Sequence, residues 1–281
     1  MFKLIVENAK GEQLTLSNNK NYIISDIDGL TPAAANINSS VIGLGDGELF
    51  ESSRVEKRSL SLSIMPRGDV EKNRIKLYKF FKPKHYVKIY YANSSRDVFI
   101  EGYVESFEGN FFTDKEVMEI GILCLQPYFK SAEEIVTDLS NILGGFSFPF
   151  AINAAGIPFS EIIRVEYENI YNGGDVESGV IIELQAEGDV VNPIIYDSIS
   201  SSLGFKITLA AGDVIRVNTY KGSKSAVLIQ NGLETNILNK LMPNPTWFRL
   251  DPGDNLLSYS CDSGADALQV RFYHYDLYEG V

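Results

Sequence analysis

Apolar and polar residues alternate along most of this chain, and a period of two is the pattern of half-buried β-strands. Between residues 54 and 66, Leu60, Leu62 and Ile64 alternate with serines. Other strands predicted in the first half are FKLIVEN and QLTL around a Lys10-Gly11 turn, YVKIYY, DVFIEGYVESFE and EVMEIGILCL. The first half is therefore predicted to be mostly antiparallel sheet.

One segment of the first half has helical spacing instead, residues 69–82. Asp69 suits an N-cap, and Pro83 ends the helix. The apolar face of this helix, which we expect to cover the sheet, carries Val70, Leu77, Tyr78 and Phe81. Arg74 falls on the same face. We expect its side chain to extend past the core to solvent, and the alternative is a pair with a buried acid.

Residues 25–50 show no clear period. They are rich in Gly, Asn and Ser and are interrupted by Pro32. A stretch of this length without regular structure is usually functional or mobile. We therefore predict an extended loop or arm.

A change of composition divides the chain into two domains. Residues 131–158 have a Gly-Gly and Pro-Phe rich passage without Lys or Arg, which indicates a linker between residues 1–130 and 159–281. The second domain has short strands at the spacing of an all-β sandwich, namely EIIRVEYENI, VIIELQAEG, NPIIYDSI, GFKITLA, DVIRVNTYK, AVLIQ, WFRLDPG, NLLSYSC and ALQVRFYHY.

The KGSKS stretch at residues 221–225 superficially resembles a phosphate-binding loop. The residue before Lys224 is Ser223 rather than Gly, and the following AVLIQ has no helical period, so the nucleotide reading is disfavoured. A hairpin fits better. We predict a two-residue type II′ turn with Gly222 at its first central position.

The charge of the chain is uneven. The net charge is −12, but residues 51–90 carry 11 Lys and Arg against 4 Asp and Glu. Residues 159–281 carry 17 acids and 8 bases. This argues against binding along nucleic acid as the main task. The basic segment is either a solvated face or a surface that docks on an acidic part of another copy.

The cysteines and the apolar runs limit the redox chemistry and the cellular location that we expect for the protein. Cys124 and Cys261 lie far apart without metal-type spacing, so we expect reduced, buried thiols. No apolar run is long enough to span a bilayer, and the first residues do not form a signal peptide. We expect neither membrane insertion nor secretion by a signal peptide.

Candidate catalytic residues are few. The histidines are His85 and His274, and His274 alternates in phase with Leu268, Val270 and Phe272, which predicts a strand histidine at a sheet edge. Hydrolytic triads are thereby disfavoured.

Other possible sites have plainer explanations. Glu101, Glu105 and Glu108 could supply a carboxylate pair, but strands often carry acids on their exposed face. The DIDG stretch at 26–29 lacks a calcium loop's final Glu, and the RGD at 67–69 is explained by the helix entry. Trp247, Phe248 and the final tyrosines could stack on a sugar, although a sandwich core also needs aromatics. We expect no catalytic, cofactor-binding or metal site.

The order of these motifs resembles the siphophage distal tail proteins. In that family an arginine-rich strand leads into a helix with an R-x-x-L motif that ends at Pro, and a C-x-x-P-Y-F-like strand closes the domain. The matching residues here are Arg74, Leu77, Pro83, Cys124, Pro127, Tyr128 and Phe129. The second half, from NPIIYDSISSS through the KGSK hairpin to the last aromatic strand, is similar to the galectin-like domain of the family.

The resemblance implies a mainly β fold, with an N-terminal antiparallel sheet or split barrel covered by one α-helix and a C-terminal galectin-like β-sandwich. It also implies a non-enzymatic protein without cofactors. Its N-terminal domains would form a hexameric ring that continues the tail tube, and its C-terminal domains would hold receptor-binding or baseplate proteins.

Further expectations follow from the same resemblance. The partners would be copies of the chain and other tail-tube, tail-tip and receptor-binding proteins, with DNA only passing through the ring. The location would be the tail tip of a virion assembled in the bacterial cytoplasm. Relatives with a sugar-binding insertion are longer, so direct receptor binding is not expected. The alternative function is a carbohydrate-binding module with a lectin-like sandwich.

Overall fold

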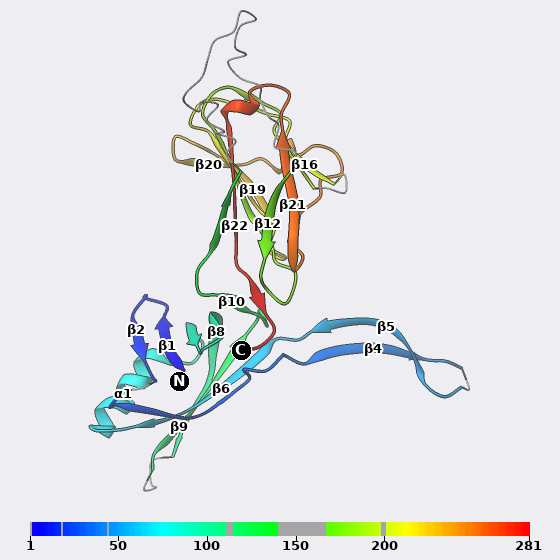
Figure 1. The fold of residues 1–281 in the computed structure, drawn as a ribbon. Coiled ribbons are helices and arrows are strands. Elements are labelled where there is room, and N and C mark those ends of the chain that lie inside the picture. The colour runs from blue at the N-terminus through cyan, green and yellow to red at the C-terminus, as the bar shows by residue number, and fades with distance from the viewer. Residues whose placement is uncertain (1, 18, 44, 111–114, 140–166, 198–200) are drawn as a thin grey trace, which may run out of the picture. The chain divides into compact units, whose positions relative to one another are not determined.

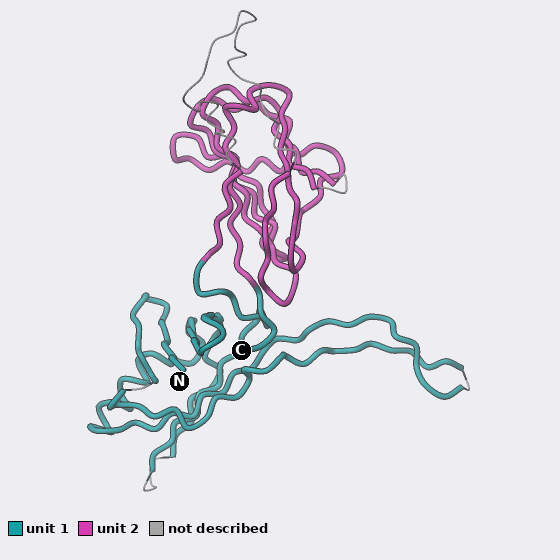
Figure 2. Tube along the Cα trace, in the orientation of Figure 1, with its two compact units in different colours: residues 1–133, 277–281 teal, residues 134–276 magenta. Residues whose placement is uncertain are grey.

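The computed structural model describes residues 2–17, 19–43, 45–110, 115–139, 167–197 and 201–281. The chain divides into two compact units (Figure 2). The first contains residues 1–133 together with residues 277–281, and the second contains residues 134–276. Each unit has its own core of buried apolar side chains.

The first unit is built on one large antiparallel sheet (Figure 1). Its strands, in spatial order, are β2 (Gln13–Thr15), β1 (Lys3–Asn8), β7 (Tyr86–Ala92), β8 (Asp97–Asn110), β9 (Val117–Cys124), β6 (Arg58–Pro66) and β3 (Tyr22–Asp28). A short strand, β10 (Phe129–Ser131), pairs with β8 and with β23 (Leu277–Tyr278). Leu60, Leu62 and Ile64 of β6 are at most 2% exposed, so the alternation read from the sequence is the core-facing side of a strand.

A single α-helix occurs in the described residues, α1 (Val70–Phe80), within the range predicted for it. The side chain of Asp69 accepts a hydrogen bond from the Lys72 amide and caps the first turn. Leu77 is fully buried against the sheet, as the helical spacing requires. The expectation for Arg74 was wrong: its guanidinium pairs with the Glu116 carboxylate at 2.9 Å instead of extending alone to solvent.

The segment at 25–50, predicted as an extended loop or arm, belongs to a long hairpin: it is an extended arm, and it is built of paired strands that the sequence pattern does not predict. Near the body of the unit, β3 pairs with β6 inside the large sheet. Further out, β4 (Ala35–Val41) pairs only with β5 (Glu48–Val55), and this pair is called the arm from here on (Figure 1). A register shift between Asn38 and Ser39 interrupts the alternation, which hides the strand pattern in the sequence.

The second unit is a sandwich of antiparallel sheets. The larger sheet has the order β11 (Ile135–Asp138), β22 (Leu268–His274), β13 (Ile181–Ala186), β18 (Val214–Asn218), β19 (Ser225–Gln230) and β20 (Leu233–Asn236). The other has the order β12 (Glu168–Asn172), β21 (Gly253–Ser260), β15 (Ile194–Asp197) and β16 (Ser202–Gly204). A short pair, β14 (Val190–Val191) with β17 (Thr208–Leu209), and two 3₁₀ turns at Leu238–Lys240 and Ala265–Ala267 complete it.

The predicted fold class, mainly β with one covering helix and a second β-sandwich, is confirmed. The division of the chain differs in detail from the linear one expected. Residues 277–281 belong to the first unit, and β11 of the second unit lies inside the expected linker 131–158. The rest of that linker, from residue 140 on, lies outside the described residues.

The KGSK hairpin is present, but its connection is longer than expected. The last ladder pair of β18 and β19 is Asn218 with Ser225, so six residues join the strands rather than two. The amide of Ser223 donates to the Tyr220 carbonyl at 3.0 Å, which places Gly222 at the third turn position with a φ of +85°. Glycine is needed there because side chains disfavour this backbone region.

Candidate assembly surfaces

Within the described part of either unit, the candidate catalytic residues form no shared catalytic group. Among the described residues, no group of three His, Cys, Asp or Glu side chains is placed to hold a metal ion. No helix in the described ranges is long and apolar enough to cross a membrane. His85 contacts the Pro83 carbonyl in the first unit, and His274 lies in the second.

Glu101 belongs to a hydrogen-bond network instead of a carboxylate pair. It accepts from the Tyr86 hydroxyl and from Lys130 Nζ, each at 2.6 Å. Burial alone would raise the pKa of this carboxyl, but the hydrogen bonds from Lys130 and Tyr86 hold that pKa below its usual value. A β-bulge between Val104 and Ser106 falls at Glu105, so the two acids do not follow a simple alternation on one strand.

His274 is fully buried in β22, which lies between β11 and β13. The prediction of a sheet-edge position was therefore wrong, although the predicted phase with Leu268, Val270 and Phe272 is confirmed because all four side chains are buried. Its Nε2 lies 3.5 Å from an Asp276 carboxylate oxygen. Burial lowers the pKa of the imidazole, against the opposing effect of Asp276.

The outer surface of α1 is basic. Lys72, Lys76 and Lys79 are exposed on it, beside the partly exposed side chains of Ile75 and Tyr78. None of these lysines forms an ion pair within the described residues that fixes its position. The lysines of the basic segment that lie on α1 thus form a solvent-facing patch of the first unit.

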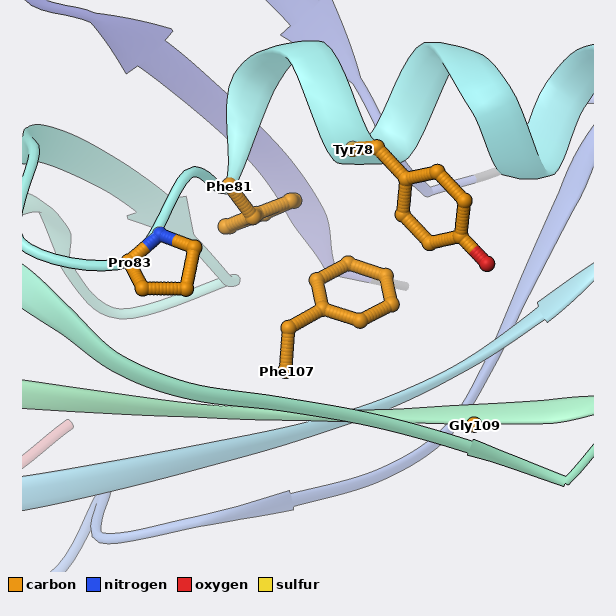
Figure 3. A pocket seen from close by; sticks show the side chains of 5 residues that line it. All are labelled: Tyr78, Phe81, Pro83, Phe107 and Gly109. Carbon is orange, nitrogen blue, oxygen red and sulfur yellow. The ribbon is translucent and has the colours of Figure 1, made fainter.

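An apolar pocket of about 340 Å³ lies beside this basic surface. Tyr78, Phe81, Pro83, Phe107 and Gly109 line it, and Figure 3 shows the Tyr78 and Phe107 rings facing each other from the helix and from β8. Their centroids are 4.9 Å apart in an edge-to-face arrangement. Helix and sheet leave this pocket open to solvent at one side of the first unit.

The arm has two chemically different faces. Residues paired across a ladder share a face, and so do alternate residues of one strand. The pairs Ala35–Val55, Ile37–Ser53, Ser39–Phe50 and Val41–Glu48 therefore form one face, and Asn36–Arg54, Asn38–Ser52 and Ser40–Leu49 form the other. Ile37, Val41 and Phe50 on the first face are each more than 60% exposed.

Such a face is unusual for a surface element, since two-stranded ribbons are marginally stable in water by themselves. The strands of the arm carry Glu48 and Glu51 against one base, Arg54, and Asp46 lies between the two strands. The arm is an acidic ribbon with one apolar side that nothing in the described part of its unit covers. In the sequence, the even spacing of Ile37 and Val41 among polar residues is the signal of this face, and the Gly, Asn and Ser around it obscure that signal.

Comparison with known proteins identifies the fold. The family model described as siphovirus-type tail component, C-terminal domain, matches residues 173–274. A sequence comparison with curated proteins finds no match.

Among solved structures, the chain resembles the Dit protein of phage SPP1, described as a paradigm of the hub adsorption apparatus in phages that infect Gram-positive hosts. The identity is 12%, 98% of each chain is covered and the TM-score is 0.69. It also resembles chains of the phage p2 baseplate in its activated conformation. For the baseplate structure with Ca, the sequence identity is 11%, the match covers 100% of each chain and the TM-score is 0.58. For the baseplate structure with Sr, the sequence identity is 12%, the match covers 98% of each chain and the TM-score is 0.57.

At these identities the likeness to solved structures concerns the fold. The fold match extends over both units, whereas the family match lies in the second unit alone. Residues 173–274 of the second unit therefore match the model of the C-terminal domain of siphovirus-type tail components, and the predicted resemblance of the chain to the siphophage distal tail proteins is confirmed.

Proposed function

We propose that this protein is a non-enzymatic structural component of the tail tip of a phage, a prophage or a related tail-like particle. It forms a ring that joins the tail tube to the baseplate and the receptor-binding apparatus. The observation that carries this proposal is the fold match over 98% of the chain to a phage hub protein, together with the tail-component domain in the second unit.

The first unit forms the ring. Its arm and its basic helix are different surfaces of one unit, and contacts between two different surfaces of identical chains are heterologous, so they close into a ring when the rotation allows. The acidic, half-apolar arm complements a surface that is basic at Lys72, Lys76 and Lys79 and apolar at the Tyr78–Phe107 pocket. The arm of one copy therefore reaches the α1 surface of the next, in a ring of six copies.

The second unit faces the other tail proteins. Its sandwich carries the siphovirus-type domain and is acidic overall, with tail-tip and receptor-binding proteins as partners. DNA is cargo that passes through the ring. A predominantly acidic protein repels the phosphate backbone and lets it slide without binding. The protein is assembled into virions in the bacterial cytoplasm.

The mass of the assembled protein tests the proposal. Native mass spectrometry with negative-stain images is expected to show a ring of six copies. A monomer that binds sugars in a glycan screen would overturn the proposal in favour of a carbohydrate-binding module. A dissociated protomer without glycan affinity that forms rings once other tail proteins are added would support it.

A further inference from the structure

Arg58, the first residue of β6, joins segments that are far apart in the sequence. Its side chain is buried, and its guanidinium donates four hydrogen bonds to backbone carbonyls. The acceptors and distances are Gly29 at 2.5 Å, Thr31 at 2.5 Å, Pro127 at 2.6 Å and Glu279 at 2.5 Å. The same group lies 4.6 Å from the centre of the Phe129 ring. A planar group with five donors suits this task, and an ammonium group does not.

Two of these carbonyls belong to the root of the arm, which we define as residues 29–34 and 56–57. The root is where the long hairpin changes from the large sheet to the free ribbon. The ladder of β3 and β6 ends at Asp28 with Ser61, and the ladder of the arm begins at Ala35 with Val55. Only the bond from the Glu56 amide to the Ala34 carbonyl bridges the two strands of the root itself. A gap of this kind in a ladder is a natural hinge.

Of the two remaining carbonyls, that of Pro127 precedes β10, and that of Glu279 belongs to residues 277–281, which we call the closing segment. β23 in this segment pairs with β10 through Phe129–Tyr278 and Lys130–Leu277. Arg96 holds the segment from another side. It donates to the Gly280 carbonyl at 2.5 Å and stacks 4.3 Å over the Tyr278 ring. The Val281 amide then donates to the Leu30 carbonyl of the root at 3.1 Å.

The carbonyls of residues 29, 30 and 31 are thus satisfied by Arg58 and by the closing segment. The glycine at 29 adds a steric constraint to the same place. Its φ is +89°, and a Cβ built there would lie 2.3 Å from the Ser59 carbonyl oxygen. The root therefore fits closely around β6, with the closing segment as one of its supports.

We propose that the first unit contains a built binding site for the peptide segment 277–281, and that this segment is a lock on the root of the arm. Bound, it fixes the direction in which the arm leaves the sheet. When the segment is released, the Leu30 carbonyl loses its hydrogen bond from the Val281 amide, and Arg58 loses the Glu279 carbonyl as an acceptor. The root is then free to act as a hinge. The segment follows the last strand of the large sheet of the second unit, β22, after only two residues. The lock does not depend on ring formation.

Hydrogen exchange measured by mass spectrometry tests the lock on full-length protein at concentrations below assembly. The informative variant is Arg96→Ala, because Arg96 donates to the Gly280 carbonyl and stacks over the Tyr278 ring, and both residues belong to the closing segment. We expect exchange in peptides covering 27–36 and 53–58 to rise about tenfold or more. Peptides from β8 and β9 serve as the internal control for folding, and their exchange is expected to stay unchanged.

Removal of residues 277–281 is the second variant, and it should give the same deprotection of the root. Faster exchange of the closing segment in Arg96→Ala with an unchanged root would overturn the proposal. So would loss of protection throughout β8 and β9 on removal of the segment, because the segment would then be a structural strand of the sheet. Both results are independent of whether the protein forms rings.

Discussion

Arg74 Nη1 of α1 and a Glu116 carboxylate oxygen, next to the start of β9, lie 2.9 Å apart. Both side chains are about one-fifth exposed, at 21% and 20%. The pair ties the helix to the sheet at its polar margin, while Leu77 and Phe80 hold the helix in the core. Sequence spacing alone had placed Arg74 on the core face and gave no information on its partner, because Glu116 is 42 residues away.

The Arg74–Glu116 pair should contribute modestly to stability. Partly exposed ion pairs contribute about 0.2–1 kcal/mol in double-mutant cycles. We expect Arg74→Gln and Glu116→Gln each to lower the free energy of unfolding of the first unit by about 0.5–1 kcal/mol, with the double variant less destabilised than the sum. Urea unfolding followed by circular dichroism measures this. Additive effects would show that the pair has no coupling energy.

Charge reversal on α1 should weaken assembly. The triple variant Lys72→Glu, Lys76→Glu and Lys79→Glu places acids opposite the acidic arm, so we expect about a tenfold or greater loss of ring at low salt. Native mass spectrometry reports the ring. Reversal of Glu48 and Glu51 to Lys in the same chain should restore it.

The matched control for this experiment reverses the charge of three exposed lysines of the second unit, with the substitutions Lys206→Glu, Lys221→Glu and Lys240→Glu. Its ring yield is expected to stay near that of the unmodified chain. Unchanged assembly of the α1 variant at low salt would contradict the electrostatic contact.

The two faces of the arm can be separated with neighbouring residues. Phe50 lies on the apolar face at 64% exposure, and Leu49 lies on the polar face at 59% exposure. If the apolar face docks on a neighbour, Phe50→Ser reduces ring yield by about tenfold or more, and Leu49→Ser has little effect. Because both residues are exposed in the single chain, neither change should alter its melting temperature. Equal losses from the two variants would refute the face assignment.

The thiols should differ in reactivity. Burial raises the pKa of Cys124 to about 12, with a smaller opposing effect from Arg58. Cys261 is partly exposed, and burial raises its pKa as well. With an aromatic disulfide reagent at pH 8, we expect Cys261 to react about a hundredfold or more faster than Cys124 in the native protein. In denaturant the two rates should become equal. Rapid native labelling of Cys124 would contradict its burial.

The second unit should lose stability in mild acid. Because burial lowers the pKa of His274 in the folded state, the unfolded state binds the proton more tightly. Stability is therefore complete above the unfolded pKa of about 6.5 and falls as the pH drops toward the folded value, by at most about 1.4 kcal/mol per pH unit. Fluorescence of Trp247, the one tryptophan of the chain, follows unfolding of this unit.

The variant His274→Gln should flatten this pH dependence, whereas His85→Gln, in the exposed loop after α1, should leave it unchanged. A slope that persists in His274→Gln would assign it to other groups.

Most of the secondary structure could be predicted from local patterns in the sequence. Alternation in β6, β9 and β22 and the spacing of α1 depend only on which face of an element meets the core, so residues such as Leu62, Ile120 and Phe272 could be assigned from their neighbours in the sequence. The order of motifs carried the family resemblance for the same reason, since each motif is a local requirement of one strand, turn or helix end.

Contacts between residues that are far apart in the sequence could not be predicted from local patterns. The four carbonyls around Arg58 come from residues 29, 31, 127 and 279, and a basic residue at the start of a strand looks the same with or without them. The arm was hidden because its ladder contains a register shift and its strands lack a core of their own. Pairing across a sheet and satisfaction of buried polar groups depend on how distant segments meet, and only the folded chain brings them together.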